Sequence, residues 1–161
     1  MPVFISYRHT DRVQAMAINA RLKQANIKTY LDVLDAESQT TDDITGVITR
    51  NITDCTHLLA VVSEKTAQSW WVPFEIGEAT ISNRRICSYQ IGPSALPLYL
   101  DKWPKLSGDT DINFFIDAYR EEVLTKRSIG LDSISESVRG TYKGNADLFH
   151  DQLKNRIRRG F

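Results

Sequence analysis

Short apolar runs alternate with segments of helical periodicity along most of this chain. The apolar runs predict β-strands at residues 3–6, 28–32, 57–62 and 85–91. Elsewhere apolar residues recur three or four positions apart, which predicts helices at residues 13–22, 44–52, 112–126 and 146–159, and one more that begins near Trp71. Alternation of strand and helix is typical of an α/β fold, an open parallel sheet with helices on both faces.

The run at residues 57–62 is the most strongly apolar part of the chain, and it is continuous rather than alternating. Such a run predicts a central strand that is covered on both faces. Ligands in folds of this kind bind beyond the carboxyl ends of the strands. Tyr7, Arg8, Asp32 and residues 63–75 lie at or just beyond the carboxyl ends of predicted strands, so they map to that edge of the sheet.

The length of 161 residues fits one domain with a substantial core. The helical pattern weakens after about Lys126, because residues 128–145 are rich in Ser, Gly and polar side chains. We therefore expect a main domain at residues 1–126 and a C-terminal extension at residues 127–161. The terminal helix of this extension is expected to pack on the same domain.

Lysine plus arginine and aspartate plus glutamate both number 20, so the formal net charge is zero. A neutral chain is not attracted to nucleic acid or to an anionic membrane surface, and no apolar run approaches the roughly 18 residues of a membrane span. Cys55 and Cys87 lie in apolar surroundings and suit buried thiols in a reducing compartment, so we expect a cytoplasmic protein. Neither Gly-rich phosphate-binding motif of parallel α/β proteins occurs, and no His or Cys spacing predicts a metal site.

Trp71 and Glu75 lie four residues apart near a predicted helix start, so they share one face of that helix and can flank a small polar ligand. Glu75 can bind such a ligand, or it can accept hydrogen bonds from the free backbone N–H groups of the helix start. Trp71 can stack on a ligand or bury its ring in the core. Arg8 can bind phosphate, or it can pair with a carboxylate such as Asp32.

Four blocks of the sequence, in this order and spacing, resemble the successive motifs of a Toll/interleukin-1 receptor (TIR) domain. They are Val3-Phe4-Ile5-Ser6-Tyr7-Arg8, Tyr30-Leu31-Asp32-Val33, Leu59-Ala60-Val61-Val62-Ser63 and Ser69-Trp70-Trp71-Val72-Pro73-Phe74-Glu75. The resemblance covers roughly residues 2 to 120 and is closest to the bacterial type. A TIR domain with only a short tail is similar to the stand-alone TIR proteins of Thoeris anti-phage defence.

The resemblance implies a flavodoxin-like fold and, in the enzymatic branch of the family, cleavage of the nicotinamide–ribose bond of NAD. The family's catalytic glutamate falls on Glu75. Its nucleotide cleft draws on the end of the first strand and on the loop after the second strand, here residues 32–38. The residues expected to contact the nucleotide are Phe4, Tyr7, Arg8, Asp32 and Trp71.

NAD is expected here as a substrate, with no bound cofactor. The resemblance further implies self-association of TIR domains and a cyclic ADP-ribose-type product that activates a downstream effector. The alternative, from another functional class, is a non-enzymatic TIR adaptor that acts through protein contacts. Many such scaffold domains lack the glutamate that this chain carries at position 75.

Overall fold

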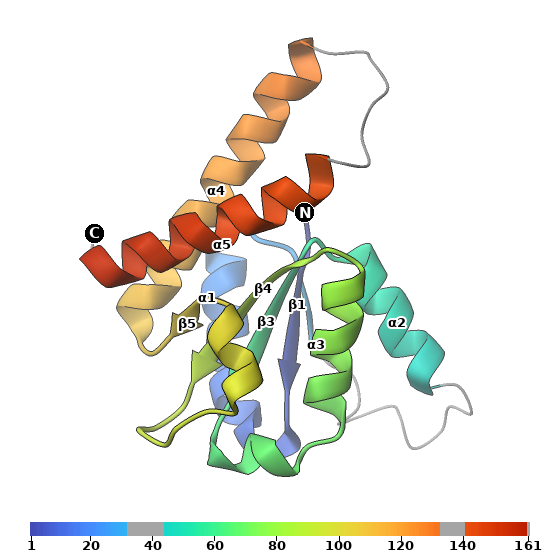
Figure 1. The fold of residues 1–161 in the computed structure, drawn as a ribbon, viewed down its shortest axis with the longest axis vertical. Coiled ribbons are helices and arrows are strands. Elements are labelled where there is room, and N and C mark those ends of the chain that lie inside the picture. Colours follow the sequence, from blue (N-terminus) through green and yellow to red (C-terminus); the bar gives the residue numbers. More distant parts are fainter. Residues whose placement is uncertain (32–43, 133–140, 161) are drawn as a thin grey trace.

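The computed structural model of the chain describes residues 1–31, 44–132 and 141–160. Its strands form one parallel sheet in the order β2-β1-β3-β4-β5 (Figure 1). The strands are Val3–Tyr7 (β1), Thr29–Leu31 (β2), His57–Val62 (β3), Arg85–Gln90 (β4) and Lys105–Leu106 (β5). The helices are Arg12–Gln24 (α1), Ile44–Asp54 (α2), Trp71–Ile81 (α3), Asp109–Asp132 (α4) and Thr141–Arg159 (α5), with short 3-10 helices at His9–Asp11 (η1), Glu64–Gln68 (η3) and Leu98–Lys102 (η4). The predicted α/β class is confirmed.

The two faces of the sheet are buried by different helices, because successive side chains of a strand point to opposite faces. Val3, Ile5, Leu59 and Val61 pack with apolar residues of α1, α4 and α5. The alternate positions, Phe4, Leu58, Ala60 and Val62, pack with residues of α2 and α3. Every residue of β3 is buried, as expected for a central strand covered on both sides.

Two elements differ from the sequence prediction. The two-residue strand β5 was not predicted, because a pair of residues carries no periodicity. Helix α4 begins at Asp109 and ends at Asp132, so it is longer than the predicted helix and runs through the boundary expected after residue 126. Asp109 and Asp111 lie in its first turn, and Asp111 Oδ2 accepts a hydrogen bond from the Ser107 N–H at 2.8 Å. Acidic residues stabilise the start of a helix but do not contribute to an apolar repeat, so the apolar pattern did not predict the first turn of α4.

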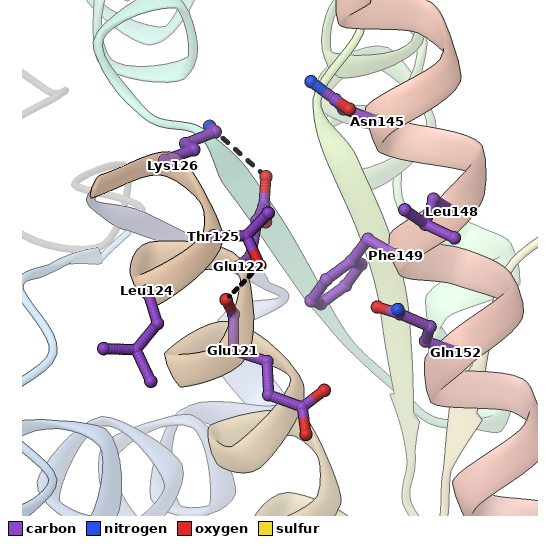
Figure 2. A pocket seen from close by; sticks show the side chains of 9 residues that line it. All are labelled: Glu121, Glu122, Leu124, Thr125, Lys126, Asn145, Leu148, Phe149 and Gln152. Carbon is purple, nitrogen blue, oxygen red and sulfur yellow. Dashed lines mark hydrogen bonds and ion pairs between the residues drawn. The ribbon is translucent and has the colours of Figure 1, made fainter. Parts of the chain in front are cut away.

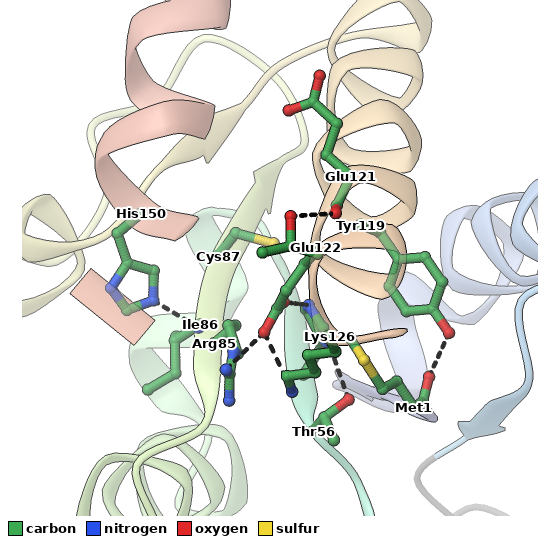
Figure 3. Close-up of polar contacts among 12 residues, drawn as sticks. Met1, Thr56, Arg85, Ile86, Cys87, Tyr119, Glu121, Glu122, Lys126 and His150 are labelled. Carbon is green, nitrogen blue, oxygen red and sulfur yellow. Dashed lines mark hydrogen bonds and ion pairs between the residues drawn. The ribbon is translucent and has the colours of Figure 1, made fainter. Parts of the chain in front are cut away.

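Helix α5 packs on α4 and covers part of strand β4. Strand β5 pairs only with Ser88 and Tyr89, which leaves the earlier residues of β4 without that neighbour. The Ile86 N–H there donates to Nε2 of His150 on α5 at 2.8 Å (Figure 3). Burial lowers the pKa of His150 to about 4, so the ring stays neutral and keeps its acceptor lone pair. A side chain of the C-terminal extension therefore completes the hydrogen bonding of the sheet.

A charged cluster lies at the amino ends of β3 and β4, opposite the edge where ligands bind in this fold (Figure 3). Glu122 of α4 lies 2.5 Å from Arg85 and 3.2 Å from Lys126, and its Oε2 is 3.2 Å from His57 Nε2. Burial lowers the pKa of His57, and Thr56 Oγ1 lies 2.8 Å from its Nδ1. A neutral ring satisfies both contacts by donating to Glu122 and accepting from Thr56. The cluster thus anchors α4 to the starts of two strands.

A hollow of about 280 Å³ lies between α4 and α5, beside the charged cluster (Figure 2). Leu124, Leu148 and Phe149 contribute apolar surface to it, and Glu122 lines it as well. Glu122, one of several polar residues in this wall, is therefore a group that the fold already uses to hold α4. Among the described residues, no helix combines the length and the apolar character needed to cross a membrane.

The contact between His150 and Ile86 predicts a loss of stability at mildly acidic pH. The imidazole of the unfolded chain takes up a proton near its usual pKa of 6.5, whereas the folded protein does so only near 4. Between these values the unfolded state binds more protons, so the free energy of unfolding should fall as pH falls, by up to about 3 kcal/mol from this group.

The variant His150→Gln is the matched control, because its amide oxygen can accept the same hydrogen bond but does not titrate. Urea unfolding between about pH 7 and pH 4 should give a shallower decline for this variant than for the wild type. His57, whose pKa is also lowered, contributes equally to both proteins. Identical pH dependence in the two proteins would contradict this assignment.

Candidate active site

The carboxyl ends of β1 and β3 meet the start of α3 at one edge of the sheet (Figure 1). Ligands bind at this edge in open α/β sheets. Several polar side chains are buried here rather than exposed to solvent, namely Ser6, Asp11, Ser63, Thr66 and Glu75. Buried polar groups need partners, so their contacts define the local structure.

Glu75 is the fifth residue of α3, and its side chain is fully buried, with 0% exposure. It shares the sheet-facing side of the helix with Val72, Ile76 and Ala79. Ser6 on β1 donates a hydrogen bond from Oγ to Oε2 of Glu75. The first turn of α3 contains no acidic residue, so the carboxylate lies just beyond the region where the helix dipole acts strongly. The hydrogen bond from Ser6 on β1 therefore contributes more to the position of the Glu75 carboxylate than the dipole at the start of α3 does.

Strand β1 places the residues predicted for the nucleotide cleft on different faces of the sheet. Phe4 is buried in the core with α2 and α3, on the same face as Ser6. Tyr7 is buried on the opposite face, in the cluster that includes α1 and α4. The structure therefore brings Ser6, and not Tyr7, to Glu75. The sequence contained a signal for this, because side chains of a strand alternate between the two faces and Ser6 lies two positions after Phe4. That spacing places Ser6 and Phe4 on the same face.

Arg8 follows β1 and reaches the segment between β3 and α3. Its guanidinium donates to the backbone oxygen of Lys65 at 2.5 Å and lies 3.4 Å from Oε1 of Gln68. It therefore braces η3 beside the site. Asp32, predicted both as a nucleotide contact and as an alternative partner of Arg8, lies outside the described residues, as does the loop at residues 32–38.

A second polar contact joins the end of β3 to the segment after β1. Ser63 donates from Oγ to Oδ2 of the buried Asp11 at 3.0 Å. Its backbone N–H donates to Thr66 Oγ1 at 2.8 Å, and its Oγ accepts from the Lys65 N–H at 3.3 Å. Ser63 thus caps η3 and ties it to η1. The sequence analysis did not identify this role, although a serine before a polar turn is a capping signal.

Two of the three tryptophans, Trp70 and Trp71, lie at the start of α3, as the sequence predicted. Trp71 is 38% exposed, and its ring packs edge-on against Phe74 with centroids 5.9 Å apart. Trp70, the residue before the helix, is 89% exposed. Trp71 therefore keeps accessible aromatic surface one helical turn before Glu75, and its contact with a nucleotide stays a prediction.

The two cysteines are not suited to act as nucleophiles. Cys55 and Cys87 are buried free thiols, and burial raises the pKa of Cys55 to about 12 and raises that of Cys87 as well. Neither is a thiolate near neutral pH. In the parts of the chain that the structure describes, no group of three or more His, Cys, Asp or Glu side chains could hold a metal ion.

The fold and the site define a class of protein: a parallel α/β domain with a buried carboxylate held at the carboxyl edge of the sheet. A sequence model of the TIR domain matches residues 3–126, so the chain belongs to the TIR domain family. The match agrees with the resemblance of the four sequence blocks and covers the elements that build the site.

Solved structures that share this fold include a TIR domain and a transferase. The TIR domain of the Toll-related receptor TRR-2 from Hydra magnipapillata is 20% identical, with a TM-score of 0.61 over 74% of this chain and 95% of that one. A 2-deoxyribosyltransferase from Bacillus psychrosaccharolyticus is 8% identical, with a TM-score of 0.54 over 70% of this chain and 90% of that one. No curated protein sequence matches the chain.

The contacts of Ser63 predict that the site region loses stability when its hydroxyl is removed. Ser63→Ala leaves the buried Asp11 without this donor and η3 without its cap, so the free energy of unfolding should fall by about 1–3 kcal/mol. Ser94→Ala is the control, because the Ser94 hydroxyl makes an exposed contact with Glu64 at 3.3 Å. Urea unfolding measures both variants, and equal losses would contradict the special role of Ser63.

Proposed function

We propose that this protein is a TIR enzyme that consumes NAD by cleaving its nicotinamide–ribose bond. The observation that carries the proposal is Glu75, a fully buried carboxylate at the position that the sequence resemblance assigns to the family's catalytic glutamate. The likeness in fold to a 2-deoxyribosyltransferase supports it further, because that enzyme, by its name, transfers a sugar group. A domain of this shape is thus compatible with chemistry at a glycosidic carbon.

The cleavage of NAD requires a fixed negative charge more than it requires an acid. The ribose C1′ is bonded to a cationic pyridinium nitrogen, and both bonding electrons leave with nicotinamide, which departs as a neutral molecule. Positive charge then develops on the ribose, as in glycoside hydrolysis. The Glu75 carboxylate stabilises that charge and accepts hydrogen bonds from the ribose hydroxyls. Water then adds to C1′ and releases a proton, or a nucleophilic atom of the same ADP-ribose closes a ring.

We also propose that the product is a cyclic ADP-ribose-type signal, which activates a separate effector in anti-phage defence of the Thoeris type. The support is the resemblance of the sequence to bacterial TIR domains. The same resemblance supports self-association of the domain, and the buried free thiols Cys55 and Cys87 support action in the cytoplasm. Activity should therefore depend on protein concentration, because a neighbouring TIR domain commonly helps to complete the cleft in this family.

The test is release of nicotinamide from NAD by the purified protein, followed by chromatography with and without lysate of phage-infected cells. Glu75→Gln keeps the size of the side chain and removes its charge, so the rate should fall roughly 10²- to 10³-fold. Glu78→Gln removes the same charge from the next turn of α3 and should leave the rate close to that of the wild type.

The product mass distinguishes the possible reactions. A cyclic product has the mass of ADP-ribose less one water, whereas hydrolysis gives ADP-ribose itself. If the wild type releases no nicotinamide under either condition, even at concentrations where it self-associates, the adaptor function is favoured instead. Equal rates for the wild type and Glu75→Gln would also contradict the proposal.

A further inference from the structure

We propose that Ser6 is a positioning residue, whose hydroxyl holds the Glu75 carboxylate in the orientation that the reaction needs. This inference rests on the proposed function, since it assigns a role within the same site. It concerns a residue that contacts Glu75 and acts through it, without touching the substrate.

The contact between Ser6 and Glu75 joins two elements that are far apart in the sequence. Ser6 lies on β1 and Glu75 on α3, 69 positions later, and both side chains are 0% exposed. A glutamate side chain has three rotatable bonds, so it can occupy many positions unless another group holds it. The hydroxyl binds Oε2 and so restricts the position and the plane of the carboxylate.

The face of the sheet beneath α3 has room for this contact because of a row of small side chains. Ser6, Ala60 and Ser88 are in register across β1, β3 and β4. The preceding row on the same face contains large residues, Phe4, Leu58 and Ile86, which also pair in register. The small row lies nearer the carboxyl edge, where Glu75 comes down from the helix. Small size gives the carboxylate space between helix and sheet.

The small side chains of this row provide space, but space alone would not keep a buried carboxylate in its charged form. Burial disfavours the charged form, and a hydrogen bond donated to the carboxylate favours it. Ala60 provides space without a donor, whereas Ser6 provides both. Position 6 therefore meets two requirements of the proposed reaction, a negative charge and a fixed location for it.

Ser88 supplies a matched control within the same row. It is also buried, with 2% exposure, and its hydroxyl has no hydrogen-bond partner among the described residues. Ser88→Ala thus removes the same atom from the same face of the sheet, two strands away from Ser6. Its effect measures what the loss of a buried serine hydroxyl does when Glu75 is not its partner.

The experiment compares the pH dependence of nicotinamide release in Ser6→Ala, Ser88→Ala and the wild type. We expect kcat of Ser6→Ala to fall roughly 10- to 100-fold with little change in KM, because a hydrogen bond to the charged group is lost. The acidic limb of its kcat/KM profile should move to higher pH, since the carboxylate becomes easier to protonate. Ser88→Ala should match the wild type in both respects.

A second variant separates positioning from packing. Ser6→Cys fills nearly the same space but is a weak hydrogen-bond donor. We expect it to be slow and to shift the acidic limb as Ser6→Ala does, and it carries the test if Ser6→Ala does not fold. Thermal unfolding of each variant shows whether it is folded at the assay temperature.

The outcomes distinguish this inference from the proposed function. If Glu75→Gln is inactive while a folded Ser6→Ala or Ser6→Cys keeps the wild-type kcat and pH profile, the positioning role is overturned and the enzyme assignment stands. If the wild type shows no release that depends on Glu75, both are overturned. A loss in Ser88→Ala equal to that in Ser6→Ala would also overturn the positioning role.

Discussion

The constraint on which the candidate site depends is the burial of one carboxylate between helix α3 and the sheet. Removing Glu75 from water has a large cost unless neighbouring groups compensate for it. The sheet meets this requirement with a serine on β1, and the small residues beside Ser6 leave space for the side chain. The surrounding segments are braced separately, by Arg8 on Lys65 and by Ser63 on Asp11. The floor of the site is therefore part of the sheet rather than a surface loop.

A second glutamate, which is only partly buried, shows what a structural carboxylate looks like in the same molecule. Burial alone would raise the pKa of Glu122, but the hydrogen bond from His57 and the charges of Arg85 and Lys126 hold it at about 2. Glu122 therefore keeps its negative charge, but that charge is already paired with these two cations, as expected for a structural carboxylate. Glu75 accepts a hydrogen bond from the Ser6 hydroxyl, which orients the carboxylate. The two ends of the sheet thus use glutamate in different ways, for anchoring α4 and for the proposed chemistry.

The sequence predicted the fold class, whereas the contacts within the candidate site depend on packing that local patterns do not encode. Continuous burial of residues 57–62 and helical spacing after Trp71 follow from local patterns, and both are present. The partner of Glu75 could not be identified in this way, because Ser6 and Glu75 meet only when β1 and α3 pack together. Tyr7 was predicted to contact the nucleotide because it lies at the end of the first strand. Side chains alternate between the faces of a sheet, and Tyr7 lies on the face opposite Ser6. The position of His150 against Ile86 likewise depends on how α5 packs, which no local pattern encodes.

The cost of the buried carboxylate is also an argument about function. A TIR domain that served only as a scaffold would need neither a charge beneath α3 nor a serine to hold it. Apolar side chains of similar size at both positions could stabilise the domain, because replacing a satisfied buried polar pair by apolar groups is often neutral or favourable. Rules of core packing are broken in real proteins mainly at functional sites. The pair formed by Ser6 and Glu75 breaks such a rule at the edge where this fold binds ligands, and this favours the enzyme over the adaptor.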